Sequence, residues 1–355
     1  MLDHTTTSDR TLAIQRVTAL WALNECGLGG ILHAFNSPFN GLLVGSLAMV
    51  CIAFICSLSE NKWRTVMTSL VIVLIIKALV SPHSSPTAYV AVIFQGVTGA
   101  LIYRYIPHLL IGSLFFFSLV LIESALQRLI MLTVLYGNSL WEAIDLWGKW
   151  VMDKWGVILP LTSSKLIIYT YLGIHFIAGL LMGWLTYRII QAVKASWGQP
   201  QFQLQLSAAD RKEFRRKSGK GKSSWKRVVF LILILVMISL AYSQLMDAGN
   251  AIQKGFVTLL RVVLILIAWY LFLAPLFLRL LQSFLKRKHH QLAGEVAHTM
   301  DMFPQILWII DKAWKETSSL RFIRRWKSFV LYSLIYLLQY KTAYDPDPDG
   351  ADPKL

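Results

Sequence analysis

Charged residues and cysteines are both scarce in this chain. Charged residues make up 15% of its 355 positions, whereas they make up about a quarter of an ordinary soluble domain. The three cysteines, Cys26, Cys51 and Cys56, all lie in apolar stretches. They form neither a disulfide framework nor a metal-ligand spacing. The low charge argues against a soluble domain, and the cysteine pattern predicts no metal centre.

Apolar residues are abundant instead, at 55% of the chain. Several apolar runs reach the roughly 20 residues that a helix needs to cross a bilayer. We therefore predict an all-α, polytopic membrane protein. It would consist of a six-helix bundle, two further transmembrane helices and a cytoplasmic amphipathic C-terminal helix. The expected spans are 15–35, 41–58, 64–81, 87–104, 108–136, 164–193, 227–246 and 256–279.

Basic residues are concentrated in every second loop between the expected spans. One set contains Arg10, Arg16, Lys62, Arg64, Arg104, the basic residues from Lys194 to Arg227, and Arg279, Lys286, Arg287 and Lys288. The opposite loops 36–40 and 82–86 contain no Lys or Arg. The positive-inside rule then predicts a multi-pass protein of the cytoplasmic (inner) membrane with both termini in the cytoplasm. It also accounts for the net charge of +16 without a nucleic-acid partner.

Composition shifts divide the chain into four regions. We expect a six-helix membrane domain (1–195), a basic cytoplasmic linker (196–226), two transmembrane helices (227–288) and a cytoplasmic amphipathic helix with a disordered acidic tail (289–355). The tryptophan-rich segment 139–156 is amphipathic, and tryptophan favours headgroup depth. It could be an interfacial lid over an outer pocket or an inert anchoring helix.

No motif for an enzyme is present. The GKGKSS sequence in the linker lacks the first glycine of a phosphate loop and follows no strand. Glu295 and His298 form one Glu-x-x-His step, whereas a carboxylate-bridged dimetal centre needs two such steps. We therefore predict no catalytic activity, no metal and no cofactor.

Polar residues gather toward the outer ends of the first six expected spans. Charges at bilayer depth are expensive, so Lys77 and Arg128 should pair with Glu25 or Glu123, or face water. Polar groups that converge from several helices describe a ligand pocket that opens outward. The alternative is that they are interhelical hydrogen bonds. The predicted substrate-binding residues are Glu25, His33, Asn36, Lys77, His83, Gln95, Glu123, Gln127, Arg128 and His175.

Small residues recur every four positions along the first expected span. The row is Thr18, Ala22, Cys26, Gly30 and Ala34. Residues four apart share one helix face, and small side chains let a second helix approach closely in a bilayer. This row predicts a docking face for a membrane partner.

Residues 10–195 resemble the substrate-binding S component of energy-coupling factor (ECF) vitamin transporters. The resemblance lies in six short spans, the small-residue face of the first helix, the SPFNG turn and the stretch PHSSPTAYVAVIFQGVTGALIYR. It implies an outward pocket for a vitamin and docking, through the small-residue row, onto a membrane coupling protein driven by cytoplasmic ATPases. Cys26 and Gly30 interrupt the alanine series that is typical of the family, and residues 196–355 lie outside the resemblance.

The leading hypothesis is therefore a membrane uptake protein that binds a small nutrient or vitamin and works with separate ATPases. A second hypothesis is a membrane-anchored scaffold whose C-terminal half recruits a cytoplasmic partner. A third is a membrane enzyme that acts on lipid, in which Glu123 and Arg128 would be catalytic.

Overall fold

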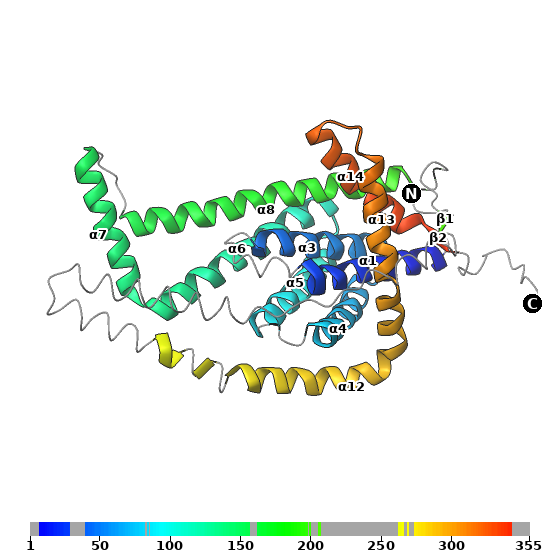
Figure 1. Cartoon of the computed structure of the whole chain (residues 1–355), viewed down its shortest axis with the longest axis horizontal. Helices are drawn as coiled ribbons and strands as arrows, with labels where there is room; N and C mark the ends of the chain where they lie inside the picture. Colours follow the sequence, from blue (N-terminus) through cyan, green and yellow to red (C-terminus); the bar gives the residue numbers. More distant parts are fainter. Residues whose placement is uncertain are drawn as a thin grey trace, which may run out of the picture. The chain divides into compact units, whose positions relative to one another are not determined.

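The computed structural model describes residues 7–28, 40–81, 84, 86–156, 162–197, 199, 205–206, 262–265, 268–269 and 273–342. Nearly all of these residues are helical (Figure 1). The helices are α1 (Thr7–Leu23), the π-helical turn η1 (Asn24–Leu28), α3 (Asn40–Leu58), α4 (Lys62–Val80), α5 (Pro86–Tyr105), α6 (Leu109–Tyr136), α7 (Asn138–Trp155), α8 (Ser163–Ala195), α12 (Ala274–Asp301), α13 (Phe303–Glu316) and α14 (Phe322–Gln339). Strands β1 (Gln205–Leu206) and β2 (Lys341–Thr342) form a short parallel pair.

Among the described residues, four helices are long and apolar enough to cross a membrane: α4, α5, α6 and α8. Helix α3 contains a shorter apolar helix, Gly45–Leu58. These helices support the predicted α-helical membrane protein. Of the two later spans, 227–246 lies outside the described residues and 256–279 is described only in part. Local signals fix the helix starts: Asn61 Oδ1 accepts the Arg64 amide at 3.2 Å, and Pro86 begins α5, where its missing donor costs nothing.

The first helix begins at Thr7, well before the predicted start near residue 15. Asp9 in its first turn favours an early start because carboxylates stabilise helix N-termini. Arg16 therefore lies within α1 and not in a loop, and it is only 3% exposed. Its Nη1 donates to the Leu338 carbonyl at 3.1 Å, and its guanidinium carbon lies 3.7 Å from the Tyr340 ring centroid. The charge of Arg16 is thus buried against the C-terminal end of α14, and its predicted place on the cytoplasmic side stays a prediction.

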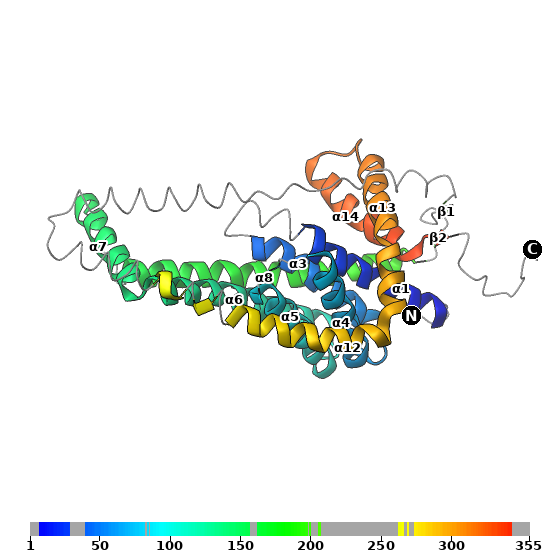
Figure 2. The same ribbon diagram turned by 60° about the horizontal axis from the view of Figure 1, so that its bottom comes forward.

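The chain forms two compact units. Unit 1 comprises residues 1–124, 175–218 and 281–355, and unit 2 comprises 125–174 and 219–280. Within unit 1, α1 packs against α3 and α4, and α4 packs along α5 (Figures 1 and 2). Within unit 2, α7 is tied to its neighbours: Trp141 Nε1 donates to Thr133 Oγ1 at 3.1 Å, and the Ser164 amide donates to Asp145 Oδ1 at 2.7 Å. The four sequence-based regions stay a prediction.

Helices α6 and α8 approach closely in unit 1. Gly179 and Gly183 are four residues apart, so they share one face of α8. A Cβ atom added at Gly179 would lie 2.5 Å from the Cα of Ser118, and one added at Gly183 would lie 2.7 Å from the Ser113 carbonyl oxygen. The two glycines therefore let the backbones of α6 and α8 meet, as the GxxxG pattern does in membrane helix pairs.

The C-terminal part of unit 1 contains α13 and α14 as a helical hairpin. Pro304 in the first turn of α13 separates it from α12. Tyr336 OH on α14 donates to Glu316 on α13, and Tyr340 OH donates to Gln305 Oε1 at 2.7 Å. Burial raises the pKa of the Tyr336 phenol, and the hydrogen bond to Glu316, which requires the phenolic proton, raises it further. The hairpin is thus held by polar contacts as well as by its apolar face.

We expect Arg16→Met to loosen this hairpin from α1. The change removes a hydrogen bond to Leu338 and a desolvated cation–π contact with Tyr340. Such contacts contribute about 2 kcal/mol, which corresponds to roughly 30-fold faster local opening. Hydrogen exchange of α13 and α14 amides measures this. Arg10→Met is the control because Arg10 contacts the exposed Glu60, 3.6 Å away. Equal exchange in the two variants would contradict the anchoring role of Arg16.

Candidate functional site

A buried ion pair joins the first helix to α4. Lys77 Nζ lies 2.7 Å from Glu25 Oε2, and the two side chains are 5% and 6% exposed. Glu25 lies in the π-helical turn η1, which departs from the regular helix, and Lys77 lies in the last turn of α4. π-Helical turns such as η1 are often found at functional sites. The expected pairing of Lys77 with Glu25 is thereby confirmed.

Further polar and aromatic groups surround this pair. Lys77 Nζ lies 6.0 Å from the centroid of the Tyr89 ring on α5. Ser81, just beyond α4, donates its hydroxyl to the Cys26 carbonyl at 3.4 Å. We call Glu25, Lys77, Tyr89 and Ser81 the ion-pair site. It brings together η1, the C-terminal end of α4 and the N-terminal part of α5.

Gln95 is buried on α5, one of the helices that form the ion-pair site. Its Oε1 atom has no hydrogen-bond partner among the described residues. Its Nε2 atom lies close to α3, because a Cβ atom added at Gly45 would be 3.3 Å away. A buried acceptor without a partner is costly, so it marks a place where a polar solute atom would be stabilising.

The other predicted substrate-binding residues are distributed over both units or lie outside the description. His175 is buried on α8, and Glu123 is half-buried on α6, both in unit 1. Gln127 and Arg128 belong to unit 2, where Arg128 is exposed. His33, Asn36 and His83 lie outside the described residues. Among the described residues of this set, Glu25 and Lys77 are joined by a direct ion pair.

Two members of the small-residue row, Thr18 and Ala22, are covered within the chain. Thr18 is buried and shares a 2.8 Å hydrogen bond with Ser69 on α4, and Ala22 is fully buried. Cys26 is half-buried, and Gly30 and Ala34 lie outside the described residues. Thr18 and Ala22 are therefore covered within the chain, and the docking face as a whole stays a prediction. The small side chains do permit a close helix approach, but the partner is α4 of the same chain.

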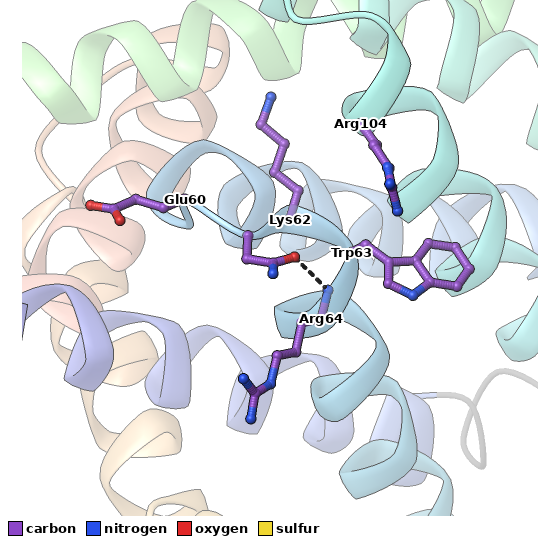
Figure 3. A pocket seen from close by; sticks show the side chains of 6 residues that line it. Glu60, Lys62, Trp63, Arg64 and Arg104 are labelled. Carbon is purple, nitrogen blue, oxygen red and sulfur yellow. Dashed lines mark hydrogen bonds between the residues drawn. The ribbon is translucent and has the colours of Figure 1, made fainter.

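A basic depression of about 620 Å³ lies where the α3–α4 turn meets the end of α5 (Figure 3). Its lining residues are Glu60, Asn61, Lys62, Trp63, Arg64 and Arg104. Lys62 Nζ donates to the Tyr103 carbonyl at 2.9 Å, so this cation stabilises the C-terminal end of α5. Figure 3 shows the Arg104 side chain directed toward the Trp63 indole. The three cations of this lining outnumber its one carboxylate, so the depression has the charge to attract an anionic group.

The sequence prediction treated these cations only as markers of orientation. Lys62 and Arg64 begin α4, whereas Arg104 lies in the last turn of α5. Their clustering follows from the packing of α4 along α5, which places the start of one helix beside the end of the other. The sequence did contain one indication of this cluster, because Lys62, Arg64 and Arg104 all lie at or beside the ends of expected spans.

In the described part of the chain, no three His, Cys, Asp or Glu side chains lie close enough together to hold a metal ion. Comparison with protein-family models, with curated proteins and with solved structures gave no match.

Proposed function

We propose that this chain is a membrane uptake protein. It binds a small polar nutrient or vitamin in a pocket that opens outward, and it works with separate ATPases. The observation that carries the proposal is the buried Glu25–Lys77 pair within a set of apolar helices. The proposed topology places both termini in the cytoplasm, so the end of α4 that holds Lys77 faces outward.

The energetics of the pair favour a binding role. Removing two charges from water costs several kcal/mol per ion, and apolar replacements of such pairs are often as stable. Ionisable residues at membrane depth therefore mark functional sites by default. A zwitterionic solute can exchange partners with the pair, its cation on Glu25 and its anion on Lys77, without leaving either charge uncompensated. Gln95 Oε1 offers an additional acceptor in the same unit.

The test is to identify what the purified chain binds. Mass spectrometry of small molecules that copurify with the protein should reveal a polar solute, and adding that solute should raise the unfolding temperature. The purified chain should not hydrolyse ATP. ATP-dependent uptake by proteoliposomes that contain this chain alone would contradict the proposal, as would failure of every polar solute to bind.

A membrane-anchored scaffold is the second candidate. It is favoured by the exposed apolar and basic side chains of the α13–α14 hairpin, including Leu307, Trp314 and Trp326. If the scaffold function is correct, substitutions on this hairpin should abolish recruitment of a cytoplasmic partner while Glu25 and Lys77 have no ligand.

A further inference from the structure

Aromatic side chains gather at the turn of the α13–α14 hairpin. The ring centroid of Trp314 lies 5.3 Å from that of Trp326 and 5.1 Å from that of Phe329. The Arg325 guanidinium lies 3.9 Å from the Trp314 ring centroid. Trp326 is nevertheless 47% exposed, and Leu320 in the turn is 38% exposed. We call Trp314, Leu320, Trp326 and Phe329 the aromatic tip. It is a defined cluster that leaves apolar surface uncovered.

Uncompensated positive charge borders the aromatic tip. Arg321, Arg324 and Lys327 are exposed and follow one another at intervals of three residues, so they lie along one side of α14. The described ion pairs of the hairpin join Lys312 to Glu316 at 4.0 Å and Lys315 to Asp311 at 2.6 Å. None of them involves Arg321, Arg324 or Lys327. These three cations are available to an external anion.

The other end of α14 lies at the edge of a membrane-spanning helix. Gln339 Nε2 donates to the carbonyl of Ser196 at 3.3 Å, and Ser196 directly follows α8, which is long and apolar enough to cross a bilayer. Helices α13 and α14 pack against each other as a hairpin, and α14 also packs against α1 (Figures 1 and 2). The hydrogen bond from Gln339 ties the C-terminal end of α14 to the residue that follows α8.

We propose that the hairpin binds anionic phospholipids at the membrane surface, with Trp326 and Leu320 at headgroup depth and Arg321, Arg324 and Lys327 on lipid phosphates. Tryptophan beside basic side chains is the composition that interfacial helices use. Anionic lipids are concentrated in the cytoplasmic leaflet, which is the side that the proposed topology gives this hairpin. The proposal does not depend on nutrient uptake.

The experiment places a spin label on the turn of the full-length chain. In a variant without cysteines (C26A/C51A/C56A), Leu320→Cys carries the label, and the protein is reconstituted in lipid nanodiscs. Collisions with oxygen report on lipid contact, and collisions with a nickel chelate report on water. We expect the label to enter the lipid phase when phosphatidylglycerol is present and to leave it at high salt, because salt screens the charges.

Matched double substitutions separate the lipid-facing cations from the paired ones. R321Q/R324Q should lower the ratio of membrane-bound to free hairpin roughly 30-fold, because each basic side chain near an anionic surface contributes about 1 kcal/mol. K312Q/K315Q removes the same charge from residues that pair with carboxylates, and it should change the ratio much less.

Two outcomes would overturn the lipid proposal. One is a label that stays in water whatever the lipid composition. The other is protection of the label by RNA or by an acidic protein in nanodiscs of phosphatidylcholine alone, which would assign the surface to a soluble partner. Comparable unfolding temperatures of the two double variants would show that either result is not caused by loss of folding.

Discussion

Lys77→Met should destabilise the protein by about 3–5 kcal/mol, the usual cost of leaving one buried charge without its partner. The Glu25 carboxylate, 6% exposed, would no longer have the ammonium group that lies 2.7 Å away in the unaltered protein. Titration with sodium dodecyl sulfate measures this free energy of unfolding, which a heating scan does not give for a protein that unfolds irreversibly. Full retention of stability in Lys77→Met would show that the two charges do not depend on each other.

The double variant E25M/K77M separates stability from function. Removing both charges leaves no uncompensated ion, so we expect stability close to that of the unaltered protein. If the ion-pair site binds the solute, the double variant should be stable and yet bind at least tenfold more weakly, which corresponds to about 1.4 kcal/mol. Unchanged binding would assign the pair a structural role only.

Gly179→Ala and Gly183→Ala should each separate α8 from α6. The added methyl groups would meet backbone atoms of Ser118 and Ser113, which cannot turn aside as a flexible side chain can. Overpacking of this kind costs about 1–3 kcal/mol, and the double variant should lose more than either single one. A crosslink between cysteines introduced on the facing surfaces of α6 and α8 would measure the separation.

Gly173→Ala is the matched control on the same helix. No described atom lies within 4 Å of a Cβ atom added there. Alanine is favoured over glycine in a helix by up to about 1 kcal/mol, so this variant should be neutral or slightly stabilised. Equal losses at Gly173 and Gly179 would mean that close approach of α8 to α6 is not the cause of the loss, because helix propensity alone predicts a gain at Gly173.

The elements that were predictable from sequence are those governed by a single strong cost. A long apolar run has few alternatives to a membrane helix, so α4, α5, α6 and α8 match the expected spans. The same reasoning applies to Lys77, whose charge needs an acid in an apolar setting, and Glu25 provides it. Gly179 and Gly183 were also readable as a GxxxG pattern, although the sequence prediction did not include it.

Other features depend on a choice between partners that the local sequence does not encode. The row with Thr18 and Ala22 favours close approach by any helix, and the tertiary fold decides that α4 fills it. Arg16 has the composition of a flanking cation, yet a carbonyl and a ring from residues more than 300 positions away bury it. Contacts of this range leave no periodic signal near Arg16 itself.

The distance along the chain between Arg16 and its partners has a consequence for biosynthesis. Translation proceeds from the N-terminus, so α1 is made long before Leu338 and Tyr340 leave the ribosome. Until then the guanidinium of Arg16 must stay hydrated or bind lipid phosphate. The packing of Arg16 against Leu338 and Tyr340 is therefore a late, post-translational step. In a chain that stops before residue 338, the Arg16 charge would stay exposed, and quality-control proteases could recognise it as a sign of incomplete folding.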